Sequence, residues 1–355
     1  MSSFWSDFVK QLEPYTPGEQ PDISNITKLN TNENPYGPSP AVLQAISQQL
    51  NDDLRLYPPP NPEKLKQTLS DYYHLRPEQV FVGNGSDEVL AHVFNGLLKH
   101  PSKGPLLFPD ITYSFYPVFC GLYGIDFQKV PLCEDFTVGP SDYLRPNGGI
   151  IIANPNAPTG MVLSLESIEA LLQKNLESVV VIDEAYVDFA DQSAVTLIDQ
   201  YSNLLVVQTL SKSRSLAGMR IGYAMGSAEL IAGLERIKNS FNSYPLGHLQ
   251  IAAAVAAFSD EDHFLKNRQL VIDQRERLST ELQSMGFKVL PSQANFVFAC
   301  HPNKSAVELA SNLRSEGIIV RHFDKPRIED FIRITVGTQS QNDLLLASLK
   351  RSLPL

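Results

Sequence analysis

The chain has 355 residues, of which 43% are hydrophobic and 19% are charged, and its formal net charge is −10. This length exceeds one ordinary hydrophobic core, so we expect two domains. The acidic balance argues against a general nucleic-acid-binding or anionic-membrane-binding surface, and an anionic substrate would therefore need a local cluster of cations.

The N-terminal stretch "MSSFWSDFVKQLEPY" lacks a basic region followed by an apolar core, which argues against a secretory signal. No apolar run approaches the roughly 20 residues that span a bilayer. The three cysteines, Cys120, Cys133 and Cys300, are an odd number without metal-ligand spacing. We therefore expect a soluble cytoplasmic protein with reduced thiols, no metal site and no membrane partner.

Short apolar runs alternate with helical periods from about residue 80 to residue 226. The expected strands are "VFVG", "PLLF", "IDFQKVPL", "GIIIANP", "SVVVIDEAY", "LLVVQTL" and "RIGYAMG". Continuous apolar strands joined by crossover helices predict an α/β fold with a mostly parallel sheet covered on both faces. In such sheets functional residues collect beyond the carboxyl ends of the strands.

After residue 230 long helical periods run to about residue 286, and a smaller α/β pattern follows them. We therefore expect a large domain over residues 30–245 and a small α/β domain over residues 246–355. The N-terminal segment, residues 1–29, is expected to pack on the small domain, because the large sheet begins only after it.

The stretch "GNGSDE" at residues 83–88 follows one of the expected strands and begins a helical period. Gly85, Ser86 and Asp87 would present backbone N–H groups at a helix N-terminus, where a phosphate binds favourably. The stretch matches neither dinucleotide nor P-loop patterns, so it does not imply a nucleotide. A simple turn that ends in a helix cap is the alternative.

Three polar side chains follow two further strands. Asn156 lies between prolines in "ANPNAPTG" and could donate to an anionic oxygen, although a surface turn would also explain it. Asp183 ends "VVVID", where burial would raise its pKa unless a cation pairs with it. An ion pair or a helix cap is the alternative for Asp183. Tyr186 follows three residues later.

Lys212 lies in "TLSKSRS", directly after an apolar strand and between two serines. A lysine at this edge of a sheet could form a Schiff base with a carbonyl group. Arg220, eight residues later, offers a planar fork that suits a phosphate. A solvated surface lysine is the usual alternative, which the flanking strands and serines disfavour.

Together these residues require one ligand with a carbonyl for Lys212 and a protonated ring nitrogen for Asp183. The ligand also needs a phenolate oxygen for Asn156 and Tyr186, and a phosphate. The predicted phosphate ligands are Gly85, Ser86, Asp87, Ser211 and Arg220. Tyr113, in "DITYSFYP", could stack on the ring or could simply belong to the core. Pyridoxal 5′-phosphate meets every requirement, and we predict it as the cofactor.

Several motifs carry a resemblance to a known family. "DEAY" at 183–186, "SKSRSLAGMRIGY" and "NPNAPTG" resemble the fold-type I aminotransferases of classes I and II. "LNTNENPYGPSP", "RLYPPPNPEKLKQTL", "VGNGSDEVL" and "IRITVGT" are similar to histidinol-phosphate aminotransferases, and the resemblance spans nearly the whole chain. Threonine-phosphate decarboxylases carry close variants of the more specific stretches.

The resemblance implies a role for each matching residue. Lys212, Asp183 and Tyr186 would be catalytic, and Asn156 would join Tyr186 at the phenolate oxygen. Tyr113 would stack on the cofactor ring. The implied substrate contacts are Arg333, which would hold the anionic end, and Arg321, Tyr15 and Asn156. Tyr57 would reach the cofactor phosphate of a neighbouring subunit, which implies a homodimer with shared active sites.

The implied reaction transfers an amino group between L-histidinol phosphate and 2-oxoglutarate, and gives imidazole acetol phosphate and L-glutamate in histidine biosynthesis. Lys212 would move the α-proton, and Arg333 would serve both half-reactions. The alternatives are an aromatic amino acid aminotransferase and a threonine-phosphate decarboxylase. A regulatory pyridoxal-phosphate-binding domain is a further alternative. It would be expected to carry a DNA-binding segment, for which the acidic N-terminal stretch of about 30 residues offers no room.

Overall fold

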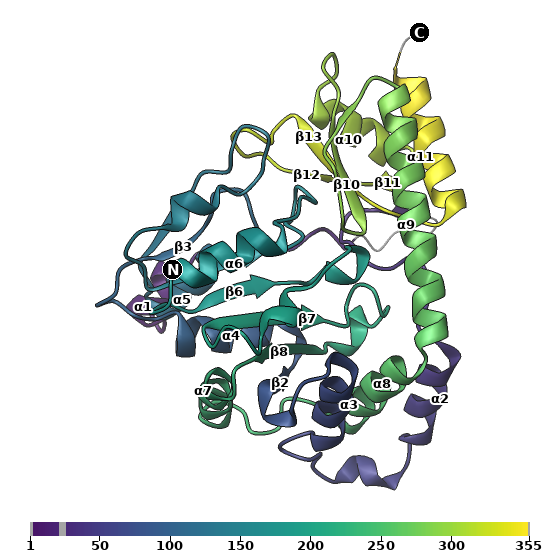
Figure 1. Cartoon of the computed structure of the whole chain (residues 1–355). Coiled ribbons are helices and arrows are strands. Elements are labelled where there is room, and N and C mark those ends of the chain that lie inside the picture. The colour runs from purple at the N-terminus through teal and green to yellow at the C-terminus, as the bar shows by residue number, and fades with distance from the viewer. Residues whose placement is uncertain (1–2, 21–25, 354–355) are drawn as a thin grey trace.

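A seven-stranded sheet forms the centre of the computed structural model, which describes residues 3–20 and 26–353 (Figure 1). The strand order is β2-β8-β7-β6-β5-β3-β4. The strands are β2 (Val80–Gly83), β3 (Leu106–Pro109), β4 (Phe127–Val130), β5 (Gly149–Ala153), β6 (Val180–Asp183), β7 (Leu204–Thr209) and β8 (Gly222–Gly226). Strand β8 is antiparallel to both neighbours, and the other adjacent pairs are parallel. The predicted mostly parallel sheet is confirmed.

Helices cover both faces of this sheet. In β5, Ile150 and Ile152 join one buried cluster and Ile151 joins the other, because successive side chains of a strand point to opposite faces. One face packs on α4 (Gly85–Leu97), α5 (Tyr116–Tyr123) and α7 (Ala228–Asn239). The other packs on α2 (Pro40–Gln48), α3 (Glu63–Tyr73), α6 (Leu165–Lys174) and α8 (His248–Ser259). Because both faces of the sheet are buried, its strands carry apolar side chains at successive positions and not only at every second one.

A second, antiparallel sheet has the strand order β12-β13-β10-β9. Its strands are β9 (Lys288–Val289), β10 (Phe296–Cys300), β12 (Arg321–His322) and β13 (Phe331–Thr335). One face packs on α9 (Glu261–Ser284), α10 (Ala306–Ser315) and α11 (Gln339–Ser352). Ile332 and Ile334 of β13 point into that core, so Arg333 and Thr335 lie on the opposite face, toward the large sheet.

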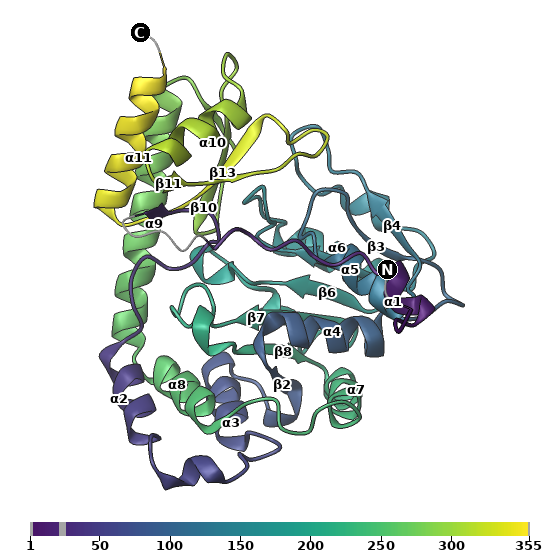
Figure 2. The ribbon, with the colours of Figure 1, turned by 180° about the vertical axis from the view of Figure 1, so that it is seen from behind.

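The N-terminal segment contacts both units. Strand β1 (Thr27–Lys28) pairs in parallel with β11 (Ile318–Ile319), and Leu29 enters the small unit's core. Helix α1 (Asp7–Gln11) lies beside α5 of the large unit in both views (Figure 2). The predicted packing on the small unit therefore applies to β1 and not to α1. Residues 1–2 and 21–25 of this segment lie outside the described residues.

The junction between the two units lies close to α8 and α9. Ala253, Ala254 and Phe258 of α8 belong to the same buried cluster as the large sheet. Helix α9 begins at Glu261 and reaches the small core through Leu278 and Leu282. We propose that the division expected at residue 246 is better placed at the start of α9, because α8 buries its apolar side with the large unit.

Two negative observations concern residues 3–20 and 26–353. No helix there combines the length and apolarity of a membrane span. Histidine, cysteine and acidic side chains there form no group of three or more that could hold a metal ion. The three cysteines are free thiols.

Candidate active site

Two adjoining cavities lie beyond the carboxyl edge of the large sheet, and one of them also reaches the small unit. The first, about 410 Å³ in volume, reaches Asp183 and Arg220, and we call it the sheet-side cavity. The second, about 560 Å³, reaches Arg321 and Arg333, and we call it the outer cavity. The two cavities share lining residues: Thr31, Tyr113, Ala157, Tyr186 and Lys212. A ligand at Lys212 can therefore extend into either cavity.

Asp183 ends β6 and lines the sheet-side cavity, although its side chain is buried. Its Oδ2 accepts a hydrogen bond of 2.8 Å from the Tyr116 hydroxyl. Its Oδ1 is buried and has no partner among the described residues. Burial raises the pKa of Asp183 to about 6. An unpartnered buried carboxylate oxygen fits a cationic donor such as a protonated ring nitrogen.

Lys212 follows β7 and lies at the boundary of the two cavities. Its Nζ donates a hydrogen bond of 3.3 Å to the backbone oxygen of Thr31 and lies 5.7 Å from the centre of the Tyr186 ring. No carboxylate forms an ion pair with it in the described part of the chain. Its amine is therefore held at the cavity without being neutralised.

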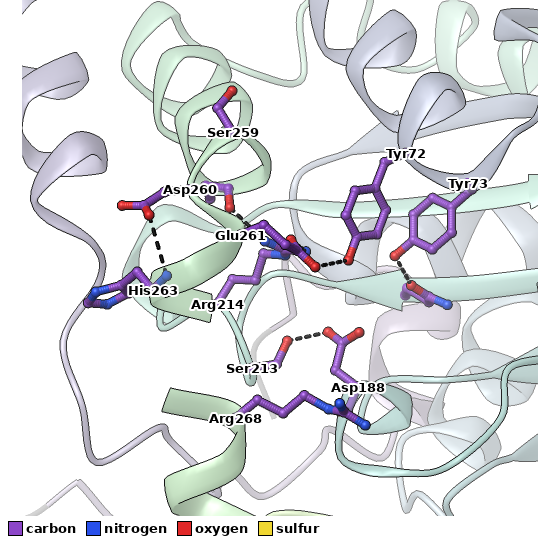
Figure 3. Close-up of polar contacts among 12 residues, drawn as sticks. Tyr72, Tyr73, Asp188, Ser213, Arg214, Ser259, Asp260, Glu261, His263 and Arg268 are labelled. Carbon is purple, nitrogen blue, oxygen red and sulfur yellow. Dashed lines mark hydrogen bonds and ion pairs between the residues drawn. The ribbon is translucent and has the colours of Figure 1, made fainter. Parts of the chain in front are cut away.

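Ser213 and Arg214, the two residues that follow Lys212, anchor the turn that carries it (Figure 3). The Ser213 hydroxyl donates to Asp188, which lies in the 3-10 helix η4 (Val187–Phe189) after Asp183 and Tyr186. The buried Arg214 guanidinium lies 4.1 Å from the Phe258 ring centre and donates to a carbonyl near the end of α8. These contacts fix the turn in the rigid core, and Lys212 projects from it.

The opposite end of the sheet-side cavity is built from two residues with positive φ. Gly85 (φ +79°) begins α4, and Arg220 (φ +51°) ends a 3-10 turn. A Cβ on Gly85 would lie 2.5 Å from Nη2 of Arg220, and the φ of Gly85 is one that other residues rarely adopt, so glycine suits this position beside the guanidinium. Arg220 pairs with Asp87 at 3.0 Å, and Ser86 and Ser211 line the cavity beside them. A helix N-terminus with an arginine and two hydroxyls suits a phosphate.

Tyr113 lines both cavities. Its hydroxyl donates a hydrogen bond of 2.9 Å to Asp87, and burial, followed by the charge of Asp87, raises its pKa. Tyr15 lines the outer cavity, with its ring 4.8 Å from Phe115 and 6.4 Å from Tyr113. The structure thus brings both predicted aromatics to the site, at its outer wall.

Asn156 lies between Pro155 and Ala157, which both line the sheet-side cavity, and its predicted contact with a ligand oxygen stays a prediction. Its Nδ2 donates to the backbone oxygen of Ile111 at 2.9 Å and to Thr159 at 3.1 Å, and its Oδ1 accepts from Thr112 at 2.9 Å. Ala157, and not Asn156, lines both cavities. Asn156 therefore stabilises the turn, and it could reach a ligand oxygen or the substrate only after giving up these bonds.

Two arginines lie side by side on the small sheet. Arg321 of β12 and Arg333 of β13 are direct partners in the antiparallel register, and both line the outer cavity. Arg333 donates to the backbone oxygen of Asn30 at 2.9 Å, whereas its Nε is buried without a partner among the described residues. Burial lowers the pKa of Arg333. Like charges opposite each other destabilise a strand pair unless an anion lies between them.

The whole outer cavity is cationic. Its charged lining consists of Lys129, Lys212, Arg321, Lys325, Arg333 and one carboxylate, Asp110. Asp110 already accepts a hydrogen bond of 3.2 Å from Arg327. Burial, together with the charges of Lys129 and Arg321, lowers the pKa of Lys325. This cavity therefore attracts anions although the protein as a whole is acidic.

Tyr57 is far more exposed than the other predicted site residues, at 80%. Its ring packs 4.9 Å from that of Tyr244, and it lines neither cavity. Leu54, Leu56 and Phe241 are also exposed, at 53%, 52% and 78%. The structure therefore does not bring Tyr57 to the site of its own chain.

Sequence reasoning missed several residues of the site. Tyr116 lies three residues after Tyr113, at the first position of α5, and that spacing could have placed it beside the same strand end. Lys129 and Lys325 belong to no motif and carry no sequence signal. Asn32, whose amide donates to Tyr186, lies in the quoted "NTNENP" stretch.

Comparisons with known proteins agree with this geometry. Residues 24–349 match the family described as aminotransferase class I and II. The chain is 62% identical to histidinol-phosphate aminotransferase 1 of Pseudomonas aeruginosa, over 98% of this chain and 99% of that protein. It is 60% identical to the histidinol-phosphate aminotransferase of Pseudomonas entomophila, over 98% and 100%.

Solved structures show the same fold. The crystal structure of histidinol-phosphate aminotransferase from Sinorhizobium meliloti, in complex with pyridoxal-5′-phosphate, superposes with a TM-score of 0.88. The two chains are 26% identical, and the match covers 100% of this chain and 99% of that one. Taken with the family match over nearly the full length, this places the chain among the class I and II aminotransferases.

Proposed function

We propose that the protein transfers the amino group of L-histidinol phosphate to 2-oxoglutarate, giving imidazole acetol phosphate and L-glutamate, as a step of histidine biosynthesis in the cytoplasm. This proposal rests on Arg321 and Arg333. The two arginines are paired in the register of the small sheet and line the cavity that Lys212 also lines. Two guanidinium groups side by side match a phosphate or a carboxylate in charge and geometry.

The residues of the sheet-side cavity fit pyridoxal phosphate, since Asp183 Oδ1 has no other partner and Gly85 leaves space for Arg220. When bound, this cofactor supplies an electron-withdrawing ring that stabilises negative charge at the substrate's α-carbon. Asp183 would accept from the ring nitrogen and keep it protonated. The phosphate would be held by Ser86, Asp87, Ser211 and Arg220 at the N-terminus of α4.

Lys212 would carry the cofactor's aldehyde in the resting enzyme. As a free amine, the Lys212 Nζ would lie at the junction of the two cavities, where it could take the α-proton of the substrate and return a proton to the cofactor's carbon, acting as general base and general acid. The hydrogen bond from Nζ to the backbone oxygen of Thr31 orients the amine without neutralising it.

We further propose a homodimer with shared active sites. Tyr57 packs on Tyr244, and both rings are exposed, as are the large apolar side chains of Leu54, Leu56 and Phe241. Exposed large apolar side chains are typical of an interaction surface where they form one patch. Mixing Tyr57→Phe subunits with Lys212→Ala subunits would create hybrids with one intact site. Restored activity supports the proposal, and no gain in verified hybrids contradicts it.

The reaction is tested by half-reaction spectra of the purified protein with histidinol phosphate, glutamate, phenylalanine and threonine phosphate in turn. We expect histidinol phosphate and glutamate to convert the bound cofactor to its amine form, and phenylalanine to do so with a much lower kcat/KM. Carbon dioxide release from threonine phosphate, or a preference for phenylalanine over histidinol phosphate, would overturn the proposal.

A further inference from the structure

The Tyr186 hydroxyl has a defined direction. It lies on the wall shared by both cavities and accepts a hydrogen bond of 2.9 Å from Nδ2 of Asn32. Among the described residues, no acceptor is within hydrogen-bond distance of its own hydrogen. Because one side of the oxygen is occupied by the amide, the hydrogen is left to point toward the cavity.

Asn32 is fixed in turn by Thr335. The Thr335 hydroxyl donates to Asn32 Oδ1 at 3.0 Å and accepts from the Asn32 backbone N–H at 3.0 Å. Asn32 is 1% exposed, and its backbone oxygen accepts from Asn295 at 2.9 Å. Reversing the Asn32 amide would leave the Thr335 hydrogen without that acceptor, so the amide hydrogens face Tyr186.

The Tyr186 hydroxyl is a side-chain donor at the wall that the two cavities share. In this structure Asn156 donates its amide hydrogens to Ile111 and Thr159, and Ala157, which lines both cavities, has no side-chain donor. A phenolate oxygen bound near Lys212 and Asp183 would be within reach of the Tyr186 hydroxyl, which lines the same cavity. The direction of that one hydroxyl hydrogen then matters for the charge on the bound oxygen.

We infer that Asn32, held by Thr335, is a positioning residue that directs the Tyr186 hydrogen onto the phenolate oxygen of the bound cofactor. Thr335 lies two residues after Arg333 on the same face of β13, so the strand that binds the substrate anion also sets this hydrogen bond. The inference depends on the cofactor and not on the identity of the amino substrate.

The test exploits the backbone of Asn32, whose φ of +56° suits asparagine, aspartate and glycine. Asn32→Gly removes the amide without backbone strain. Asn32→Asp replaces the donor by a carboxylate, which would accept the Tyr186 hydrogen and turn it away from the cavity. Neither change replaces a charged group that lines the cavities, and these groups are Glu33, Asp87, Asp110, Lys129, Asp183, Lys212, Arg220, Arg321, Lys325 and Arg333.

The readout is the pH midpoint of the absorbance change of the bound cofactor in the holoenzyme without substrate. Deprotonation of the lysine-linked nitrogen leaves the neighbouring oxygen more negative, and a donor to that oxygen lowers the midpoint. We expect Asn32→Gly to raise the midpoint by about one pH unit and Asn32→Asp to raise it further.

Three control variants separate positioning from general damage. Thr335→Val should raise the midpoint less than Asn32→Gly, and Thr335→Ser, which keeps the hydroxyl, should restore it. Asn342→Asp places a carboxylate at an equally buried asparagine that does not contact Tyr186, and it should leave the midpoint unchanged. Asn32→Asp also adds a negative charge. The test is therefore decided by the midpoints of the uncharged variants Asn32→Gly, Thr335→Val and Thr335→Ser.

The inference is overturned if Asn32→Gly and Thr335→Val both bind cofactor fully and keep midpoints within about 0.2 pH unit of wild type, under 0.3 kcal/mol. It is also overturned if Thr335→Ser shifts the midpoint as far as Thr335→Val. If Asn32→Gly fails to fold, the Thr335 pair alone gives the answer. A protein that prefers another amino donor but shows these shifts would contradict the proposed function and leave the inference standing.

Discussion

The sheet-side cavity and the outer cavity differ in how their charges are balanced. In the sheet-side cavity Arg220 pairs with Asp87 at 3.0 Å, and Asp183 accepts from Tyr116 at 2.8 Å. In the outer cavity, Arg321, Lys325 and Lys129 have no carboxylate partner within the described residues. The sheet-side cavity thus pairs one cation within the protein and leaves Asp183 Oδ1 open to a cationic group of a bound ligand. The outer cavity, which we propose binds two different anions in turn, keeps an excess of cations, and each bound substrate supplies the balancing negative charge.

The largest expected effect comes from removing the one cation that both cavities share. Lys212→Ala should lower transamination by at least about 10⁴-fold, because both the covalent link and the proton carrier are lost. Lys325→Ala, which removes a cation from the outer cavity alone, is the matched control. Borohydride reduction of the wild-type holoenzyme followed by peptide mapping should place the cofactor on Lys212, and a label on another lysine refutes the role.

Asp183→Asn should lower the activity of the enzyme but raise the stability of the cofactor-free protein at pH 8. An amide cannot keep a ring nitrogen protonated, so kcat should fall on the order of 1000-fold. The cofactor-free protein should nevertheless become more stable at pH 8, because the variant no longer buries a carboxylate. Equilibrium denaturation of both cofactor-free proteins at pH 5 and pH 8 measures this difference, and turnover near the wild-type value would contradict the first expectation.

The sign of the stability effect follows from the pKa of Asp183, which burial raises from 3.8 to about 6. Between these values the folded state keeps a proton that the unfolded state has lost. The free energy of unfolding therefore falls as the pH rises from about 4 to about 6. The full shift corresponds to about 3 kcal/mol above pH 6. Glu184, whose pKa burial raises to about 7, is present in both proteins and cancels in the comparison.

Arg333→Ala tests whether the outer cavity uses one anchor for both substrates. Leaving a buried anion without its partner costs about 2–5 kcal/mol, or roughly 30-fold to several thousand-fold in kcat/KM. Both half-reactions should suffer, and Arg333→Lys should already be impaired because an ammonium lacks the fork geometry. Measuring kcat/KM separately for histidinol phosphate and for glutamate checks this. If kcat/KM for either substrate falls by less than about twofold, Arg333 does not bind the anionic group of both substrates.

The smallest expected effect lies at the rim of the outer cavity. Lys325→Gln should raise KM for both substrates only a few-fold, since exposed charges contribute about 1 kcal/mol or less. The effect should shrink further as the salt concentration rises. Lys304→Gln, a lysine outside both cavities, serves as the control. Salt-independent KM values for wild type and variant alike would show that Lys325 does not help to balance the substrate's charge.

The sequence predicted the sheet and its carboxyl edge well, and the residues that end strands, such as Asp183 and Lys212, fell together as expected. It could not tell that the Asn156 side chain is hydrogen-bonded within its own turn, so the ligand contact of Asn156 stays a prediction. It gave no sign of Lys325, because an exposed loop lysine has no pattern. Nor could it link Asn32 with Thr335, since a hydrogen bond between residues 303 positions apart depends on how two units pack.

The pairing of β1 with β11 and the bonds from Asn32 to Thr335 have a consequence for biosynthesis on the ribosome. The large sheet can assemble once β8 has left the exit tunnel. The N-terminal strand must then wait for its partner, and loops this long close slowly. The wall that holds Lys212 against Thr31 is therefore finished last. A nascent chain stalled before β13 would have its sheet but could not yet carry out the reaction.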